Sequence, residues 1–331
     1  MPDPRLDVLC IGNAIVDVIA NAADEFLARE GLVKGSMRLI DADEAERLYA
    51  HMGPAHQVSG GSAGNTAAGV AALGGRAGFI GQVALDQLGE FYRHNLTAAG
   101  VEFITPAADV GQPTARSMIL VTPDGHRTMN TFLGAAQHLA KSALDEEEIR
   151  DSAILYLEGY LWDPETPRHA MVRAIEVARE AGRKVAFTLS DMFCVDRHRD
   201  EFNQLLNGER IDILFANQAE IEALAGIAHL ESAVATIASK VETLVVTRSE
   251  DGALATRRGE RADVPAQPIE DLVDTTGAGD LFAAGFLLGT ARRKSLEDSL
   301  RLGAIAAAEV IQHYGARPEA DLRSLAGELA A

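Results

Sequence analysis

The chain has few cysteines, few basic residues relative to acidic ones, and no long apolar run. Its two cysteines, Cys10 and Cys194, lie far apart and lack the spacing of metal ligands, so we expect neither a disulfide framework nor a zinc site. No stretch reaches the length of a membrane-spanning helix, and residues 1–5 do not lead from a basic segment into an apolar run. These shortages predict a soluble protein of the reducing cytoplasm, with no membrane partner.

Basic residues are too few for a typical nucleic-acid-binding protein. The chain has 30 Lys and Arg against 49 Asp and Glu, which gives a net charge of -19. Such a surface repels phosphate backbones and anionic membranes, so no nucleic-acid partner is expected. A solvated acidic surface is a sufficient explanation of the excess, and the charge by itself predicts no partner.

Two nucleotide-binding motifs are also missing. The sequence contains no G-x-x-x-x-G-K-[ST] loop, which excludes a P-loop kinase. No G-x-G-x-x-G turn follows the first predicted strand, which weighs against a nicotinamide enzyme.

Short apolar runs alternate with amphipathic stretches along most of the 331 residues. This pattern is typical of a doubly wound α/β fold, in which helices cover both faces of a mostly parallel sheet. We predict one such domain over residues 1–331. Strands are predicted at residues 6–11, 77–82, 153–157, 184–189, 211–216 and 242–247. Helices are predicted at residues 64–73, 86–99, 165–181, 217–225, 281–291 and 296–313.

Two segments, 14–45 and 114–133, break this alternation. In the second, two extended runs flank Thr122-Pro123-Asp124-Gly125, whose Pro and Asp-Gly supply turn geometry for a hairpin. The two segments predict a small inserted β-sheet. It could be a decoration at the edge of the domain or a lid over the ligand end of the large sheet.

Residues 274–280 read Asp-Thr-Thr-Gly-Ala-Gly-Asp and precede an apolar helix. Gly277 and Gly279 permit a tight turn whose N–H groups converge, and the positive end of the helix faces the same point. Asp280 then lies beside the resulting anion hole, where it could deprotonate a hydroxyl group. A bare G-x-G-D is more often an ordinary helix start.

Three further runs carry polar groups at predicted strand or helix ends. Asp17 follows the first strand and could accept hydrogen bonds from two vicinal hydroxyls, although a lone Asp there is often a turn residue. Residues 60–65, Gly-Gly-Ser-Ala-Gly-Asn, can approach a ligand closely and end on an amide, or form a flexible loop. Asn217 and Glu220 share one face of a helix's first turn, where they could also form a capping box.

With these runs, the chain resembles the carbohydrate and purine kinase family that includes ribokinase and adenosine kinase. The resemblance implies a ribokinase-like fold and an ATP-dependent phosphotransferase with an alcohol group as acceptor. It implies that Asp280 is the catalytic base. The γ-phosphate would be held by the N–H groups of Gly277, Ala278 and Gly279. A monovalent cation, typically potassium, would be bound by carbonyls near Asp274 and Thr276.

The resemblance also assigns the other runs. The substrate would be bordered by Gly60 and Gly61, which act as the lid hinge, and bound by Asp17, Ser62 and Asn65. Asn217 and Glu220 would organise magnesium and its waters around the ATP phosphates. Residues 247–252 resemble a T-x-G-x-x-G loop for ATP, but Ser249 replaces its glycine, so only Thr247 and Gly252 are carried over. His313 would lie near the adenine or be a structural histidine.

Within the family the chain is most similar to bacterial adenosine kinases, through residues 59–66, 114–118, 129–134 and 158–162. Phe132 could cover a flat purine or belong to the lid core. Arg116 could meet a phosphate or a substrate hydroxyl, or pair with surface acids. The implied reaction is phosphorylation of the 5′-hydroxyl of adenosine, giving AMP and ADP. A ribokinase-like or fructokinase-like sugar kinase, a non-catalytic nucleoside-binding module, and either a monomer or a homodimer remain open.

Overall fold

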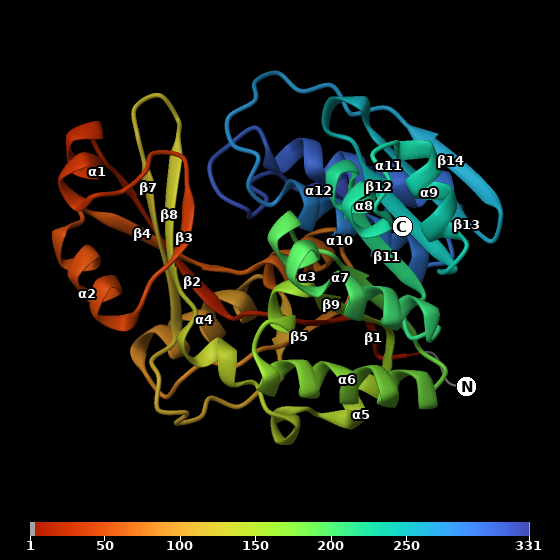
Figure 1. Cartoon of the computed structure of the whole chain (residues 1–331), viewed down its shortest axis with the longest axis horizontal. Coiled ribbons are helices and arrows are strands. Elements are labelled where there is room, and N and C mark those ends of the chain that lie inside the picture. Colours follow the sequence, from red (N-terminus) through yellow and green to blue (C-terminus); the bar gives the residue numbers. More distant parts are fainter. Residues whose placement is uncertain (1–3, 331) are drawn as a thin grey trace.

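A computed structural model describes residues 4–330 of the chain, which form one large and one small β-sheet with helices packed against them (Figure 1). The large sheet has nine strands in the order β14-β13-β12-β11-β10-β9-β1-β5-β6. Strands β12, β13 and β14 pair antiparallel, and the other neighbours pair in parallel. The strands are β1 Leu6–Ile11, β5 Ala77–Ile80, β6 Val101–Phe103, β9 Ser152–Glu158, β10 Lys184–Thr188, β11 Ile213–Asn217, β12 Thr243–Thr247, β13 Ala253–Arg257 and β14 Glu260–Val264.

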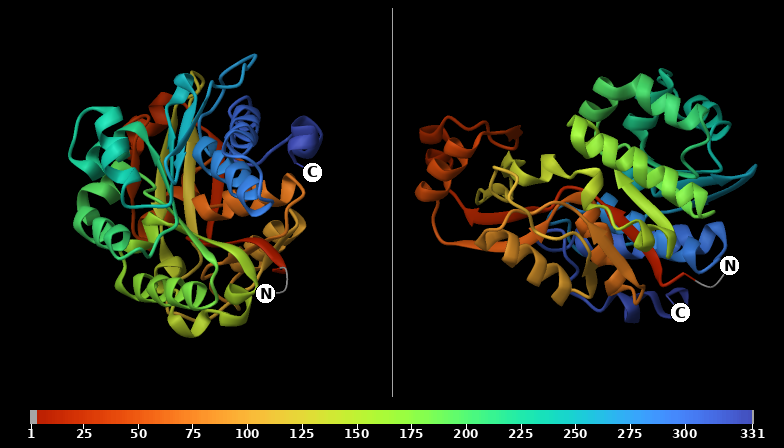
Figure 2. Two further views of the ribbon diagram at one scale, coloured as in Figure 1. Left: turned by 90° about the vertical axis from the view of Figure 1, so that its right-hand side faces the viewer. Right: turned by 90° about the horizontal axis from the view of Figure 1, so that it is seen from below.

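Helices cover both faces of the large sheet (Figure 2), which confirms the doubly wound prediction. Every residue of β1 is buried; Val8 and Cys10 join one apolar core, and Leu9 and Ile11 join the other. Burial on both faces is why these strands read as continuous apolar runs. One core contains α3 Ser62–Ala72, α4 Gln87–Ala98, α10 Ala278–Ala291, α11 Leu296–Val310 and α12 Leu322–Ala326. The other contains α5 Glu146–Arg150, α6 Glu165–Glu180, α7 Met192–Asn207, α8 Gln218–Ala225 and α9 Leu230–Ala238.

The predicted strands and helices of the large domain are all present, with shifted ends. Helix α10 begins at Ala278 because Gly277, at φ 80°, turns the chain into the helix earlier than its apolar pattern suggests. Strands β6, β13 and β14 and helices α5, α7, α9 and α12 were not predicted. Helix α7 is kinked at His198, which has non-helical φ and ψ angles. Its residues 196–201 are all charged or polar, so the sequence shows no apolar repeat there.

The small sheet has the strand order β3-β8-β7-β2-β4. Its strands are β2 Ile15–Asn21, β3 Met37–Leu39, β4 Ala55–Gly60, β7 Ala115–Val121 and β8 Arg127–Phe132. Segments 14–45 and 114–133 therefore both contribute strands, whereas the polar strand β4 was missed. The predicted hairpin is present between β7 and β8; Gly125 has φ 83° and its N–H donates to the carbonyl of Thr122 at 2.8 Å.

Two helices, α1 Asp24–Glu30 and α2 Ala42–His51, accompany the small sheet. Their buried residues Leu27 and Leu48 share an apolar cluster with Met118, Leu120 and Phe132 of the sheet. The small sheet stands beside the large one (Figure 1), and the chain enters it directly after β1 and leaves it through β4 into α3.

Short 3-10 helices lie at Gly134–His138, Lys141–Ala143, Gly159–Trp162, Ser249–Asp251 and Gly327–Leu329.

Within residues 4–330 we find no single helix long and apolar enough to cross a membrane. Only α8 and α9 taken together, across a bend of 66°, reach that length and composition.

Candidate active site

A cavity of about 720 Å³ lies where the two sheets meet. The large sheet lines it with residues at or just after the carboxyl ends of five strands: Asn13, Glu158, Thr188, Asn217 and Thr247. The small sheet lines it with Asp17, Met37, Ser117, Met129 and Thr131, among others. The carboxyl ends of parallel strands are where open α/β sheets bind ligands, so this cavity is the candidate active site.

The glycine-rich turn before α10 reaches this cavity. Gly277 has φ 80°, and a Cβ atom placed on it would lie 2.5 Å from the Cβ of Ala316, so both its conformation and its surroundings require glycine. No side chain caps α10; the backbone N of Ala278 donates to the carbonyl of Thr275 at 3.2 Å, and Gly277 and Gly279 line the cavity. The positive end of the helix therefore faces the cavity, as an anion hole requires.

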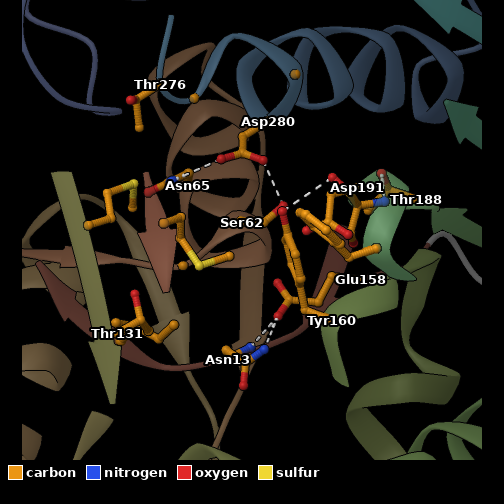
Figure 3. Close-up of a pocket in the computed structure, with 18 of the residues that line it drawn as sticks. Asn13, Ser62, Asn65, Thr131, Glu158, Tyr160, Thr188, Asp191, Thr276 and Asp280 are labelled. Atoms are coloured by element: carbon orange, nitrogen blue, oxygen red, sulfur yellow. Dashed lines mark hydrogen bonds between the residues drawn. The ribbon is translucent and has the colours of Figure 1, made fainter. Parts of the chain in front are cut away.

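Asp280, the third residue of α10, faces the first turn of α3 across the cavity (Figure 3). Ser62 Oγ donates to its Oδ1 at 2.6 Å, and Asn65 Nδ2 donates to its Oδ2 at 2.9 Å. Burial raises the pKa of Asp280, and these two hydrogen bonds and the charge of Arg317 act against that rise. A carboxylate has about four acceptor positions, so two remain for a hydroxyl proton.

The diglycine turn is shaped by close contacts. A Cβ atom on Gly60 would lie 2.3 Å from Oδ2 of Asp17, and one on Gly61 would lie 2.1 Å from the carbonyl oxygen of Asn13. Only Gly61 of the pair lines the cavity. Burial raises the pKa of Asp17 to about 6, although the charges of Arg127 and Arg317 lower it. The turn therefore lets Asp17 lie against backbone, beside the cavity.

Glu158, the last residue of β9, was missed by the sequence analysis. It accepts hydrogen bonds from the backbone N and side-chain Nδ2 of Asn13, both at 2.7 Å, and from the backbone N of Ala63 at 2.8 Å (Figure 3). Burial raises its pKa to about 7. Strand β1 lies between β5 and β9, so the strand order reverses there, and an acidic residue at such a switch point was the available signal.

Arg127, on β8, links the small sheet to the glycine-rich turn and was also missed. Its guanidinium forms an ion pair with Asp274 and donates to Oγ1 of Thr276 at 2.9 Å. An arginine beside a hairpin turn is usually a surface residue, so the sequence around Arg127 did not indicate that it belongs to the site. Tyr160 and Asp191, which line the cavity, and Arg317 were not singled out either.

The predicted potassium site involves the same residues. Asp274 also accepts hydrogen bonds from the backbone N of Thr276 at 3.0 Å and of Gly315 at 2.9 Å. Its carboxylate is thus neutralised by Arg127, and the side chains here do not fit a second cation. Residues 4–330 contain no group of three or more potential His, Cys, Asp or Glu metal ligands. A role for the Asp274 and Thr276 carbonyls stays a prediction.

Asn217 and Glu220 form the capping box that begins α8. Asn217 Oδ1 accepts from the backbone N of Glu220 at 2.9 Å, and the Glu220 carboxylate accepts from Asn217 N at 2.9 Å and Nδ2 at 2.7 Å. Both residues line the cavity, and burial raises the pKa of Glu220 to about 7. One buried carboxylate with acceptor positions left over fits magnesium held through water, which typically takes few protein ligands beside phosphates.

The structure does not bring Phe132 and Arg116 to the cavity. They are cross-strand partners on one face of the small sheet, whereas Ser117 and Thr131, the next pair along, face the cavity. Phe132 belongs to the apolar cluster under α1 and α2, and Arg116 lies 3.8 Å from Glu46. Of the alternatives, Phe132 is core and Arg116 faces a surface acid, because side chains of a strand alternate between its faces.

Two residues proposed for the ATP side also lie outside the cavity lining. Gly252 closes the β12–β13 turn, where its carbonyl accepts from Arg248 N at 2.8 Å, and Ser249 adopts φ 51° in place of the expected glycine. His313 lies 3.2 Å from Oε1 of Glu309 on the preceding turn of α11, as a structural histidine would. Thr247 does line the cavity.

Comparison with known proteins gives consistent matches over almost the whole chain. The model of the pfkB family carbohydrate kinases matches residues 6–322. The crystal structure of a probable sugar kinase protein from Rhizobium etli is 48% identical, covers 98% of each chain and has a TM-score of 0.91. That of adenosine kinase from Sinorhizobium meliloti is 49% identical, covers 97% of this chain and 98% of its own, and has a TM-score of 0.90. Adenosine kinase from Saccharomyces cerevisiae is 28% identical, over 93% of this chain and 95% of its own.

Proposed function

Because the chain belongs to the pfkB family of carbohydrate kinases, we propose that it transfers the γ-phosphate of ATP to the 5′-hydroxyl of adenosine, giving AMP and ADP. The family makes the chain a phosphotransferase with an alcohol group as acceptor and ATP as co-substrate. The observation that carries the proposal is the placement of Asp280 in the uncapped first turn of α10 and beside Asn65.

Asn65 supplies a second polar group for the substrate. Its Nδ2 donates to Asp280, whereas its Oδ1 is buried and has no hydrogen-bond partner within residues 4–330. A buried acceptor without a partner is costly unless a ligand supplies a donor. A substrate hydroxyl can donate to Asn65 while the reacting hydroxyl donates to Asp280, and Asp17 is available to the ribose diol.

The phosphate side uses the turn and α8. The N–H groups of Gly277, Ala278 and Gly279 would hold the γ-phosphate as charge develops on it. Glu220, with Asn217, would hold magnesium through water, and magnesium would neutralise charge on the ATP phosphates. Thr247 lies at the neighbouring strand end and would contact the nucleotide.

The cavity face of the small sheet favours a nucleoside over a bare sugar. Met37, Leu39, Met129 and Leu133 give it apolar surface, and the hydroxyls of Ser117 and Thr131 lie 2.8 Å apart within it. A flat base gains from apolar contact with a few polar groups, whereas a small sugar needs mainly hydrogen bonds. The similarity to a bacterial adenosine kinase at 49% identity supports the same substrate.

A panel of phosphate acceptors tests the substrate. With ATP and magnesium, and with and without potassium, we expect kcat/KM for adenosine to exceed that for ribose and fructose by about 10²-fold or more, because only a nucleoside uses the apolar surface. Inosine, which lacks the exocyclic amine of adenosine, tests whether that amine contributes to substrate recognition. ADP formation measured by a coupled assay gives the rates.

The similarity to a probable sugar kinase at 48% identity keeps a sugar kinase as the second candidate. Faster phosphorylation of ribose or fructose than of adenosine would replace the nucleoside proposal by this one. The proposed base and anion hole are shared by both candidates, so that result would leave them standing.

We also propose that the small sheet acts as a lid. Its β8 residue Arg127 already forms an ion pair with Asp274, before the turn that leads into α10, and residues 114–133 should close further over a bound substrate. Ligand at about 100 times its Kd stabilises the binding form by about 2.7 kcal/mol, so amide exchange in residues 114–133 should slow by up to about 100-fold with adenosine.

Hydrogen-exchange mass spectrometry measures this protection, and the β13–β14 hairpin at the far end of the large sheet serves as an internal control. Unchanged exchange in residues 114–133 at saturating adenosine would reduce the small sheet to a fixed wall of the cavity.

A further inference from the structure

Arg317, in the loop after α11, holds both ends of the diglycine turn. Its Nε donates to the carbonyl oxygen of Ser59 at 3.0 Å, and its Nη1 donates to the carbonyl oxygen of Gly64 at 2.9 Å. Its Nη2 donates to the carbonyl and, at 3.0 Å, to Oγ of Ser59. One guanidinium therefore bridges the residue before the two glycines and a residue of the first turn of α3.

The residues just before Arg317 touch the other turn of the site. The backbone N of Gly315 donates to Oδ2 of Asp274 at 2.9 Å. Ala316 lies against Gly277, where a Cβ atom would be only 2.5 Å from its own. Residues 315–317 thus contact the turn that carries Asp280 with one end and the diglycine turn with the other, and they set the spacing between the two.

Within the described part of the chain, residues 4–330, Arg317 forms no ion pair. All its hydrogen bonds within residues 4–330 go to neutral oxygens of Ser59 and Gly64. The ionisable groups that face it are Tyr92 of α4, Asp17 of β2 and Asp280 of α10. A buried cation usually has a carboxylate partner, so the burial of the Arg317 guanidinium without one requires a different explanation.

The two carboxylates supply that explanation. Asp17 and Asp280 both line the cavity, and the negative charge of Asp280 raises the pKa of Asp17, because two negative charges in a shared site oppose each other's ionisation. Arg317 lowers the pKa of both groups, against the rise caused by burial. Other charges also act here: Arg127 on Asp17, and Glu158, Tyr156 and Tyr160 close to Asp280.

We propose that Arg317 is a positioning residue: it fixes the diglycine turn against the turn that carries Asp280, and its charge allows Asp17 and Asp280 to be negative together. The inference rests on the proposed role of Asp280 as base. Without the charge of Arg317 the pKa of both carboxyls would be higher, and one of the two would keep its proton to higher pH.

The test compares Arg317→Met and Arg317→Lys with a matched control, Arg93→Met. Within residues 4–330, Arg93 likewise donates only to backbone carbonyls, those of Phe103 and Thr105, and no charge of a cavity carboxylate acts on its pKa. In R317M we expect the acidic limb of the pH profile of kcat/KM to move to higher pH by about one unit, as loss of a nearby opposite charge predicts. R317K keeps the charge and loses the fork of donors, so it should keep the limb and lose about tenfold or more in kcat.

An acidic limb of R317M at the wild-type pH would overturn the electrostatic role, and wild-type kcat in R317K would overturn the geometric one. R93M should match the wild type in both; a shift there would mean that any lost arginine moves the limb. If R317M does not fold by circular dichroism, the limb of R317K decides, because a shift with the charge retained contradicts the proposal. Asp280→Asn, measured in parallel, tests the base separately: turnover retained in D280N removes the base, whatever the Arg317 variants show.

Discussion

Asp280→Asn should lower turnover by about 10²- to 10⁴-fold, the usual contribution of a general base, with little change in KM for ATP. The asparagine fills the same space but cannot accept the hydroxyl proton. It also turns one hydrogen-bond acceptor into a donor, facing either Ser62 Oγ or Asn65 Nδ2. Single-turnover measurement with adenosine and ATP separates the chemical step from product release.

The same substitution should not destabilise the fold strongly. The pKa of Asp280 is raised in the folded protein, so the carboxyl favours the folded state when protonated, and this stability is lost as pH rises through the folded pKa. An uncharged asparagine does not ionise, so D280N does not lose this stability as the pH rises. The Tm of D280N at neutral pH should therefore equal or exceed that of the wild type. The offsetting change is the mismatched hydrogen bond.

Asp298→Asn is the matched control. Asp298 is likewise the third residue of its helix, α11, and is half-buried, but it accepts from Ser295 Oγ at 2.7 Å and does not line the cavity. Wild-type turnover in D298N together with the loss in D280N would assign the effect to the site rather than to helix capping. Near-normal turnover in correctly folded D280N would contradict the base assignment.

Gly279→Ala should separate folding from phosphate binding. Gly279 has no atom within 4 Å of an added Cβ and an ordinary φ, and it lines the cavity. The variant should therefore fold with a Tm within a few degrees of the wild type, since alanine suits a helix better than glycine. Its methyl group, however, projects where the γ-phosphate would meet the N–H groups, and kcat should fall by about 10²- to 10³-fold, the usual cost of a lost oxyanion donor.

Gly277→Ala should behave differently from Gly279→Ala. There the added methyl group meets Ala316 and the backbone has φ 80°, so that variant should lose both stability and activity. Gly259→Ala, at φ 88° with nothing within 4 Å, measures the cost of the backbone conformation alone. Thermal unfolding and steady-state kinetics on all three variants provide the comparison. Full activity in G279A would place the phosphate elsewhere.

The sequence predicted the parts of this molecule that depend on local pattern. The doubly wound sheet follows from apolar runs at β spacing, and Gly61 and Gly277 were found because close approach and positive φ demand glycine. Phe132 shows what such a pattern cannot predict. The alternation of side chains along a strand places each residue on one of two faces, but it does not indicate which face meets the ligand.

The groups that were missed act through contacts between distant parts of the chain. Glu158 binds Asn13 and Ala63, and Arg127 reaches Asp274, across separations of 145, 95 and 147 residues. No local pattern encodes such pairs. Helix α7 was missed for a different reason, because residues 196–201 are six consecutive charged or polar residues and carry no apolar repeat.

The first turn of α3 has a consequence for the way the protein is made. Its consecutive residues bind partners that are synthesised much later: Ala63 binds Glu158, Ser62 binds Asp280 and Gly64 binds Arg317, 95, 218 and 253 residues further along the chain. Closing such long loops is slow and entropically unfavourable until the intervening chain has folded. The first turn of α3 can therefore form all these contacts only after the last strands and helices have left the ribosome. The growing polypeptide has no assembled catalytic centre until nearly all of it has been translated.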